Sequence, residues 1–228
     1  MFAFKKLRDR LYELRFDDQH EMCMTFLRYQ EFYESPRFVG RSFTLAEFMS
    51  WYVKEQSKDG TFSYPKDWGG FNMPVNIIKQ VNDLGIADPN HYDALMSAVY
   101  KMITAQCDNA YIIGVTYDAG IDKHELTHAM YHIDDKYHKL SNQIMTTNLG
   151  LIEELQVPLL NGGYASSTVI DEIQAYITTG DHRYFFKKFE KRKDFKELES
   201  ALKELHKSHY ASFLKTIIKQ KLSDKKKR

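Results

Sequence analysis

The residues in this chain whose types and spacing favour chemistry form the run His124-Glu125-Leu126-Thr127-His128. On a helix, residues four apart lie one above the other on the same face. Two neutral imidazoles at that spacing can hold one Zn²⁺ ion, and a glutamate between them can act as a base towards a water on the metal. The run therefore predicts a zinc site with His124 and His128 as ligands and Glu125 as general base.

The residues before this run predict where it lies. Residues 110–115 (AYIIGV) are β-branched and aromatic and are bounded by turn-forming residues, which is typical of a strand. Asp122 then stands at a helix N-cap position, and no glycine or proline occurs from Lys123 to about Tyr137. The motif is expected in the first turns of a helix that follows a strand.

A strand followed by a helix carrying H-E-x-x-H resembles the zincin metalloproteases, and the resemblance covers residues 108–180. It implies a peptide or protein substrate, with the strand at 110–115 offering its edge to an extended chain. Zinc lowers the pKa of a bound water from 15.7 towards about 7. Glu125 would take the proton of this water and pass it to the leaving amine.

A catalytic zinc usually takes three protein ligands, so a third is needed. Glu172 is expected on a helix that begins near Ser166 or Ser167 and ends before Gly180. The gluzincin branch of the family uses a glutamate on such a later helix, and this resemblance favours Glu172. It also implies an aspartate four residues further on to orient the first histidine, whereas this chain has Tyr176 there.

Two other carboxylates remain as alternatives for the third ligand. Asp134 has the third-ligand spacing of the metzincin pattern, but that pattern requires a glycine where this chain has Tyr131. On an uninterrupted helix Asp134 would point away from His128. Asp171 is adjacent to Glu172 on a different helix face. Zincins also use a tyrosine or histidine as an oxyanion donor, and Tyr164 and Tyr176 are the candidates for that role.

Simpler interpretations of the same residues lead to other functions. Asp122 and Glu125 have the spacing of a capping-box variant, and the histidines can be packing residues. One alternative is a zincin-fold regulatory or toxin-like protein with a metal site and restricted or no proteolysis. The other is a metal-free helical interaction protein. Glu125 favours catalysis over the first alternative, because a site that only binds needs no base.

Composition limits the class of protein. The chain has 228 residues, with 32 lysines and arginines against 31 acids, so no overall positive field predicts nucleic-acid binding. Two cysteines are too few for a disulfide framework and indicate thiols in a reducing compartment. Neither a signal-peptide segment nor an 18-residue apolar stretch occurs, so we expect a cytoplasmic protein without membrane contact, although signal-less secretion is compatible with the sequence.

The expected fold is α+β, predominantly helical and zincin-like, with a small sheet packed on the metal-binding helix. Helices are predicted from Phe4 to about Tyr33, broken near Phe16, and at about 45–56, 74–84, 91–105 and 148–156, the last ended by Pro158, with a loop at 58–73. We expect one domain over 1–228. Its parts are a helical region at 1–105, the metal-site core at 108–180, a helical region at 181–222 with Phe195, Leu198, Leu202 and Leu205 at helical spacing, and a basic tail at 223–228.

Overall fold

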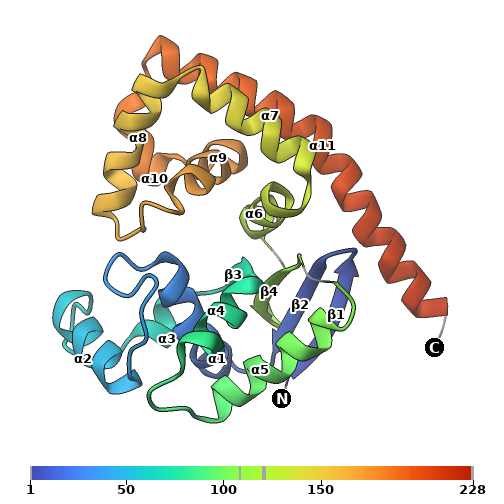
Figure 1. The fold of residues 1–228 in the computed structure, drawn as a ribbon. Helices are drawn as coiled ribbons and strands as arrows, with labels where there is room; N and C mark the ends of the chain where they lie inside the picture. Colours follow the sequence, from blue (N-terminus) through green and yellow to red (C-terminus); the bar gives the residue numbers. More distant parts are fainter. Residues whose placement is uncertain (1, 108, 120–121, 227–228) are drawn as a thin grey trace. The chain divides into compact units, whose positions relative to one another are not determined.

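The computed structural model describes residues 2–107, 109–119 and 122–226, with side chains described up to residue 220. The chain divides into two compact units, Met1–Ile121 and Asp122–Arg228. Figure 1 labels the helices and strands of both units. The single domain expected from the sequence stays a prediction, and the side chains of the basic tail lie outside the described part.

The first unit holds all four described strands and five helices. They are, in chain order, β1 (Phe2–Arg8), β2 (Leu11–Phe16), α1 (Gln19–Glu34), α2 (Leu45–Glu55), α3 (Tyr64–Asp67), β3 (Phe71–Pro74), α4 (Asn76–Leu84), α5 (His91–Thr104) and β4 (Tyr111–Thr116).

The strands form one mixed sheet in the order β1-β2-β4-β3. β1 and β2 are an antiparallel hairpin, β2 and β4 run parallel with Leu11 opposite Tyr111, and β3 lies antiparallel to β4. β4 therefore has hydrogen-bonded neighbours on both sides. The expectation that this strand offers a free edge to an extended substrate is wrong over residues 111–114, because β3 occupies that edge.

The N-terminal hairpin corrects the sequence prediction of a helix from Phe4. Leu7, Leu11 and Leu14 have the spacing of a helical stripe, yet they lie in the two strands and are fully buried. β2 is buried on both faces, so it lacks the polar–apolar alternation that identifies a strand exposed on one side. The pairing of β2 with β4, about 100 residues later in the chain, is long-range and leaves no local pattern. The helix begins only at α1, where Asp18 accepts a hydrogen bond from the Glu21 backbone N–H.

The segment predicted as a loop over 58–73 contains α3 and most of β3. Pro74 ends β3 and does not begin α4, as the sequence suggested. A proline at the end of this strand is tolerated, since β3 lies at the edge of the sheet. Other boundaries agree with the sequence: α4 ends before Gly85, which has a φ of 87°, and α5 covers almost the whole of the predicted 91–105 helix.

The second unit consists of helices in its described part. They are α6 (Lys123–Ile133), α7 (Asp135–Thr146), α8 (Leu149–Asn161), α9 (Val169–Thr179), α10 (Arg183–Phe186), the 3₁₀ turn η1 (Lys187–Phe189) and α11 (Lys193–Lys226). α8 continues through Pro158 instead of ending before it. The proline lies in the last turn, where Leu155 and Leu159 on either side of it are fully buried and hold the helix in place. On α11, Phe195, Leu198 and Leu202 are buried, as the helical spacing predicts, whereas Leu205 is only half-buried.

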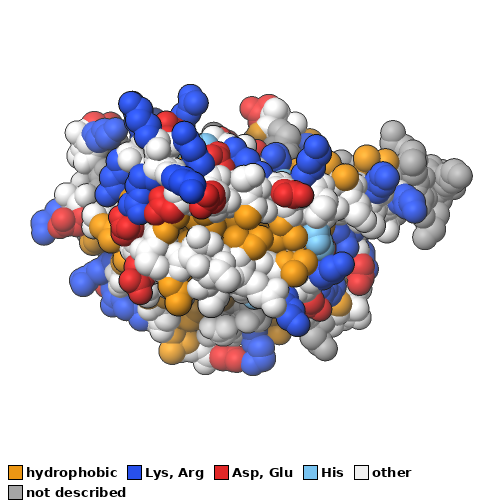
Figure 2. All heavy atoms as spheres, turned by 90° about the horizontal axis from the view of Figure 1, so that it is seen from above, with side chains coloured by type: hydrophobic (Ala, Val, Ile, Leu, Met, Phe, Trp, Pro, Cys, Tyr) orange, Lys and Arg blue, Asp and Glu red, His pale blue; other side chains and the backbone are white. Residues whose placement is uncertain are grey.

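The α+β class with a predominance of helix and a small sheet is confirmed. Packing of the sheet on the motif helix stays a prediction, since the two belong to different units. None of the described helices combines the length and the apolar character needed to cross a bilayer. Lysine and arginine side chains lie among aspartates and glutamates on the face shown in Figure 2, in keeping with a net charge of +1.

Candidate metal centre

The H-E-x-x-H run opens α6, as the sequence predicts. Asp122 caps the helix and accepts a hydrogen bond of 3.2 Å from the backbone N–H of His124. One helical turn brings the Nε2 atoms of His124 and His128 to 3.1 Å from each other. His128 is almost completely buried, whereas His124 is partly exposed. Both imidazoles therefore direct the same nitrogen to one place on the face of α6.

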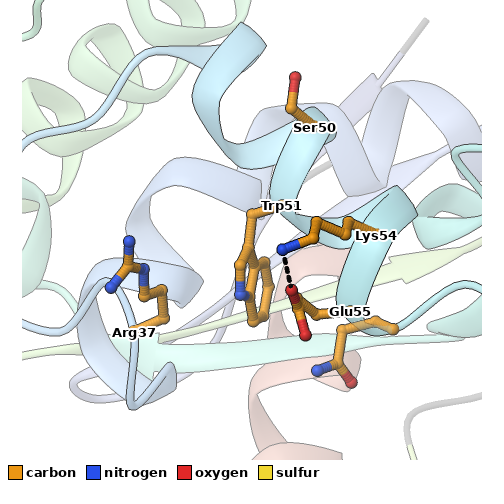
Figure 3. A pocket seen from close by; sticks show the side chains of 6 residues that line it. Arg37, Ser50, Trp51, Lys54 and Glu55 are labelled. Carbon is orange, nitrogen blue, oxygen red and sulfur yellow. Dashed lines mark ion pairs between the residues drawn. The ribbon is translucent and has the colours of Figure 1, made fainter.

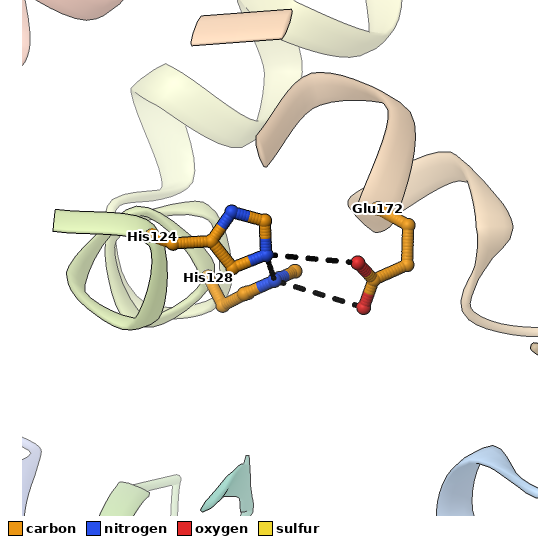
Figure 4. Close-up of side chains that lie close together, drawn as sticks. All are labelled: His124, His128 and Glu172. Atoms are coloured by element: carbon orange, nitrogen blue, oxygen red, sulfur yellow. Dashed lines mark hydrogen bonds and ion pairs between the residues drawn. The ribbon is translucent and has the colours of Figure 1, made fainter. Parts of the chain in front are cut away.

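Glu172 completes the group from α9, which packs against α6. Its Oε1 lies 3.6 Å from Nε2 of His128, and its Oε2 lies 3.8 Å from Nε2 of His124. Figure 4 shows the carboxylate facing the two ring nitrogens.

The spacing of these three side chains suits a metal ion. With metal–donor distances of about 2.0–2.2 Å, the ligand atoms of a tetrahedral zinc site lie about 3.4 Å apart. Here the two Nε2 atoms are 3.1 Å apart, and they lie 3.6 and 3.8 Å from different oxygens of the Glu172 carboxylate. With one donor atom from each residue, all three donors lie within 4.8 Å of one another. Glu172 Oε2 is buried and accepts no hydrogen bond from the described residues, so a cation bound between the two imidazoles would satisfy it. The group can hold a metal ion.

The charges around His128 also favour a cation. Burial lowers the pKa of this imidazole, but the carboxylates of Asp171 and Glu172 outweigh burial, and the pKa lies well above its usual value. Glu125 adds to this effect from its place between the two histidines on α6. The site thus attracts positive charge, and a metal ion would compete with a proton for it.

The two alternative third ligands are placed elsewhere. Asp134 ends α6 with an extended backbone, caps α7 by accepting from the Tyr137 backbone N–H at 3.0 Å, and accepts from Nδ1 of His209 at 3.2 Å. The prediction that the motif helix continues to about Tyr137 is therefore wrong, because an aspartate at this point is a good N-cap for a second helix. The helix does pass Tyr131, as expected. Asp171 contacts His128 through Nδ1, the nitrogen that faces away from the group.

The two candidate oxyanion donors lie together beside His124. The ring of Tyr176 is centred 4.7 Å from the imidazole of His124, and its hydroxyl is 2.8 Å from that of Tyr164. Both tyrosines also contact the ring of Phe185. The structure brings them close to the candidate site, and their role as oxyanion donors stays a prediction.

Several residues that support the site carry no signal in the sequence. Thr179 Oγ1 lies 3.4 Å from Nδ1 of His124, and His206 on α11 lies 3.0 Å from the hydroxyl of Thr127 on the motif helix. Lys123 donates to the backbone carbonyl of Thr178. A threonine or a histidine on a long helix is unremarkable in sequence, so only the packing of α9 and α11 on α6 identifies these contacts.

A separate hollow occurs in the first unit. It has a volume of about 630 Å³, is open to solvent and is lined by Trp51 together with mostly exposed polar side chains of α2 and by Arg37. Figure 3 shows Lys54 and Glu55 paired with each other at its wall. Its lining residues form no cluster of metal ligands or nucleophiles. The histidine–glutamate group is therefore the stronger candidate for a functional site.

Comparison of the chain with models of protein families, with curated proteins and with solved structures finds no match. The geometry and charge of the site therefore carry the functional inference.

Proposed function

We propose that the protein is a zinc-dependent metallopeptidase with His124, His128 and Glu172 as metal ligands and Glu125 as general base. The observation that carries the proposal is the convergence of two Nε2 atoms and one buried carboxylate, whose donor atoms lie within 4.8 Å of one another and can share one metal ion. The glutamate between the two histidines favours a hydrolytic site over a purely binding one, because a site that only holds a metal needs no base. Resemblance of the motif to the zincins supports peptides as the substrate class.

A bound zinc ion would supply Lewis acidity, lowering the pKa of a water and polarising a carbonyl. The protein contributes the remaining steps. Glu125 would remove a proton from the attacking water and return it to the leaving amine. Its half-buried position on the motif helix leaves it accessible to such a water. Tyr164 and Tyr176, on the His124 side, are the candidates to donate a hydrogen bond to the developing oxyanion.

The strand β4 cannot bind an extended substrate over residues 111–114, because β3 already pairs with it there. A peptide substrate would therefore have to bind elements of the chain other than this part of β4.

The decisive experiment separates Glu125 as a base from Glu125 as a helix-cap residue. Glu125→Gln alters none of the proposed ligands, so the variant should keep its zinc while peptide hydrolysis falls at least about 10²-fold. Hydrolysis is followed with a peptide library to which the wild-type chain responds, and zinc is measured in the same samples. A variant that cleaves as fast as wild type would refute the role of Glu125.

Two other functions remain as competing proposals. A regulatory or toxin-like protein would bind zinc but show no Glu125-dependent hydrolysis across the peptide library. A metal-free interaction protein would contain no zinc at all. Zinc content and the Glu125→Gln comparison together distinguish all three.

A further inference from the structure

The outward-facing nitrogens of the two motif histidines both contact side chains of α9, the helix that also supplies Glu172. His128 Nδ1 lies 3.0 Å from Oδ1 of Asp171, and His124 Nδ1 lies 3.4 Å from Oγ1 of Thr179. In a metal site the other nitrogen of a ligand histidine usually donates to such a partner, which fixes the tautomer and the ring orientation. The other hydrogen bonds of Asp171 and Thr179 determine which atom donates in each of these two contacts.

At His128 the acceptor is Asp171, and it is itself held in place. Tyr137 on α7 donates to Oε1 of Gln174 at 2.8 Å, which turns the amide nitrogen of Gln174 towards Asp171 Oδ1, also at 2.8 Å. Tyr137 and Gln174 are both completely buried. The carboxylate oxygen thus receives one hydrogen bond from Gln174 and is available as acceptor to His128, so the neutral imidazole carries its hydrogen on Nδ1 and its lone pair on Nε2.

At His124 the acceptor is Thr179. A threonine hydroxyl has one hydrogen, and Thr179 donates it to the backbone carbonyl of Ala175 at 2.8 Å. Its oxygen can therefore only accept from His124, which places the hydrogen on Nδ1 and the lone pair on Nε2. Tyr176, at the position where the gluzincin resemblance implies an orienting aspartate, contributes its ring to His124 instead.

We propose that α9 fixes the tautomers of both histidines, with Asp171 and Thr179 as positioning residues that aim the Nε2 lone pairs at the point faced by Glu172. This inference rests on the proposed metal site and extends it. One helix thereby supplies the third ligand and orients the other two. The carboxylate that orients a histidine acts on the second histidine of the motif and comes directly before the glutamate ligand.

The test uses the full chain and zinc alone as the probe, with affinity measured by competition against a chromophoric chelator. Asp171→Asn should weaken zinc binding about 10–100-fold, since the amide accepts more weakly than a carboxylate. Thr179→Val should weaken it less, because the longer contact is to a neutral hydroxyl, and Thr179→Ser should restore wild-type affinity. Glu153→Gln, which removes an exposed carboxylate on α8, is the control for charge.

A second measurement distinguishes positioning from general loss of structure. In the zinc-loaded wild-type chain, the Nδ1–H proton of His128 should give a downfield NMR signal because a carboxylate accepts it. Zinc-loaded Asp171→Asn should show that signal shifted upfield. Wild-type zinc affinity in both Asp171→Asn and Thr179→Val, or an unmoved His128 signal, would overturn the inference while leaving the metal site intact. Absence of zinc from the wild-type chain would overturn the proposed function and this inference together.

Discussion

Acidification should destabilise the second unit through His206, which is 4% exposed and lies against the hydroxyl of Thr127. Thr127 donates its own hydrogen to the Lys123 carbonyl, so the neutral His206 must donate from Nε2. Burial, with a smaller contribution from the charge of Lys123, lowers the pKa of His206 from 6.5 to about 4. The ring of Tyr137 also packs against it.

The sign and size of the effect follow from linkage. The unfolded chain takes up this proton near pH 6.5 and the folded chain only near pH 4, so the stability contributed by neutral His206 is complete above pH 6.5 and is lost as the pH falls to about 4. One pKa unit corresponds to about 1.4 kcal/mol, so the full loss is on the order of 3 kcal/mol. His128, whose pKa is raised, contributes in the opposite direction, because its stabilisation is complete below pH 6.5 and falls as the pH rises.

Comparing the wild-type chain with His206→Gln separates the effect of His206 on the pH dependence of stability from the effects of His128 and the carboxylates, because both chains share those groups. His206→Gln keeps an N–H that can donate to Thr127 but cannot be protonated in this range. Urea unfolding of both chains, followed by far-UV circular dichroism in the presence of a chelator, gives the free energy of unfolding at each pH from 7.5 to 4. The wild-type value should fall relative to the variant by about 3 kcal/mol, mostly between pH 6.5 and 4. A difference that stays constant over this range would refute the assignment of a buried, neutral His206.

Two further variants test the fold and the ligand set. A Cβ added at Gly114 would lie 2.4 Å from the ring of Phe26, so Gly114→Ala should lower the stability of the first unit by about 1–3 kcal/mol. Tryptophan fluorescence reports this unfolding, because both tryptophans lie in that unit. Unchanged stability would mean that the ring of Phe26 is free to move. Glu172→Ala should weaken zinc binding strongly whereas Asp134→Ala should spare it, as seen by chelator competition, and the reverse order would remove Glu172 from the ligand set.

The part of the site that depends on helical spacing could be predicted from the sequence. His124 and His128 share a face because of the four-residue spacing, and Asp122 and Gly180 mark helix boundaries through their capping chemistry. Placing Glu172 against them needed the family resemblance, since nothing local to residues 166–180 says which helix α9 packs on.

The contacts that hold the histidines could not be predicted, because each joins residues from separate helices. From the sequence, Asp171 is an alternative third ligand. Only the packing of α9 against α6 shows that its carboxylate contacts Nδ1 of His128. His206 is separated from Thr127 by 79 residues. Such pairings depend on tertiary packing, which periodicity does not encode.

The end of α6 at Asp134 was not predicted, although aspartate is a residue that often caps the start of a helix. The absence of glycine and proline favoured one continuous helix, yet an aspartate that can cap a new helix and accept from His209 ends α6 at this point.

Zinc content tests the central claim most directly. The purified wild-type chain, supplemented with zinc and kept away from chelators, should contain about one zinc per molecule by elemental analysis, and His124→Ala or His128→Ala should remove it. His138→Ala is the matched control, because this histidine is exposed on α7 and lies outside the donor group. A wild-type chain without zinc, or a His138→Ala variant that loses as much metal as His128→Ala, would contradict the account.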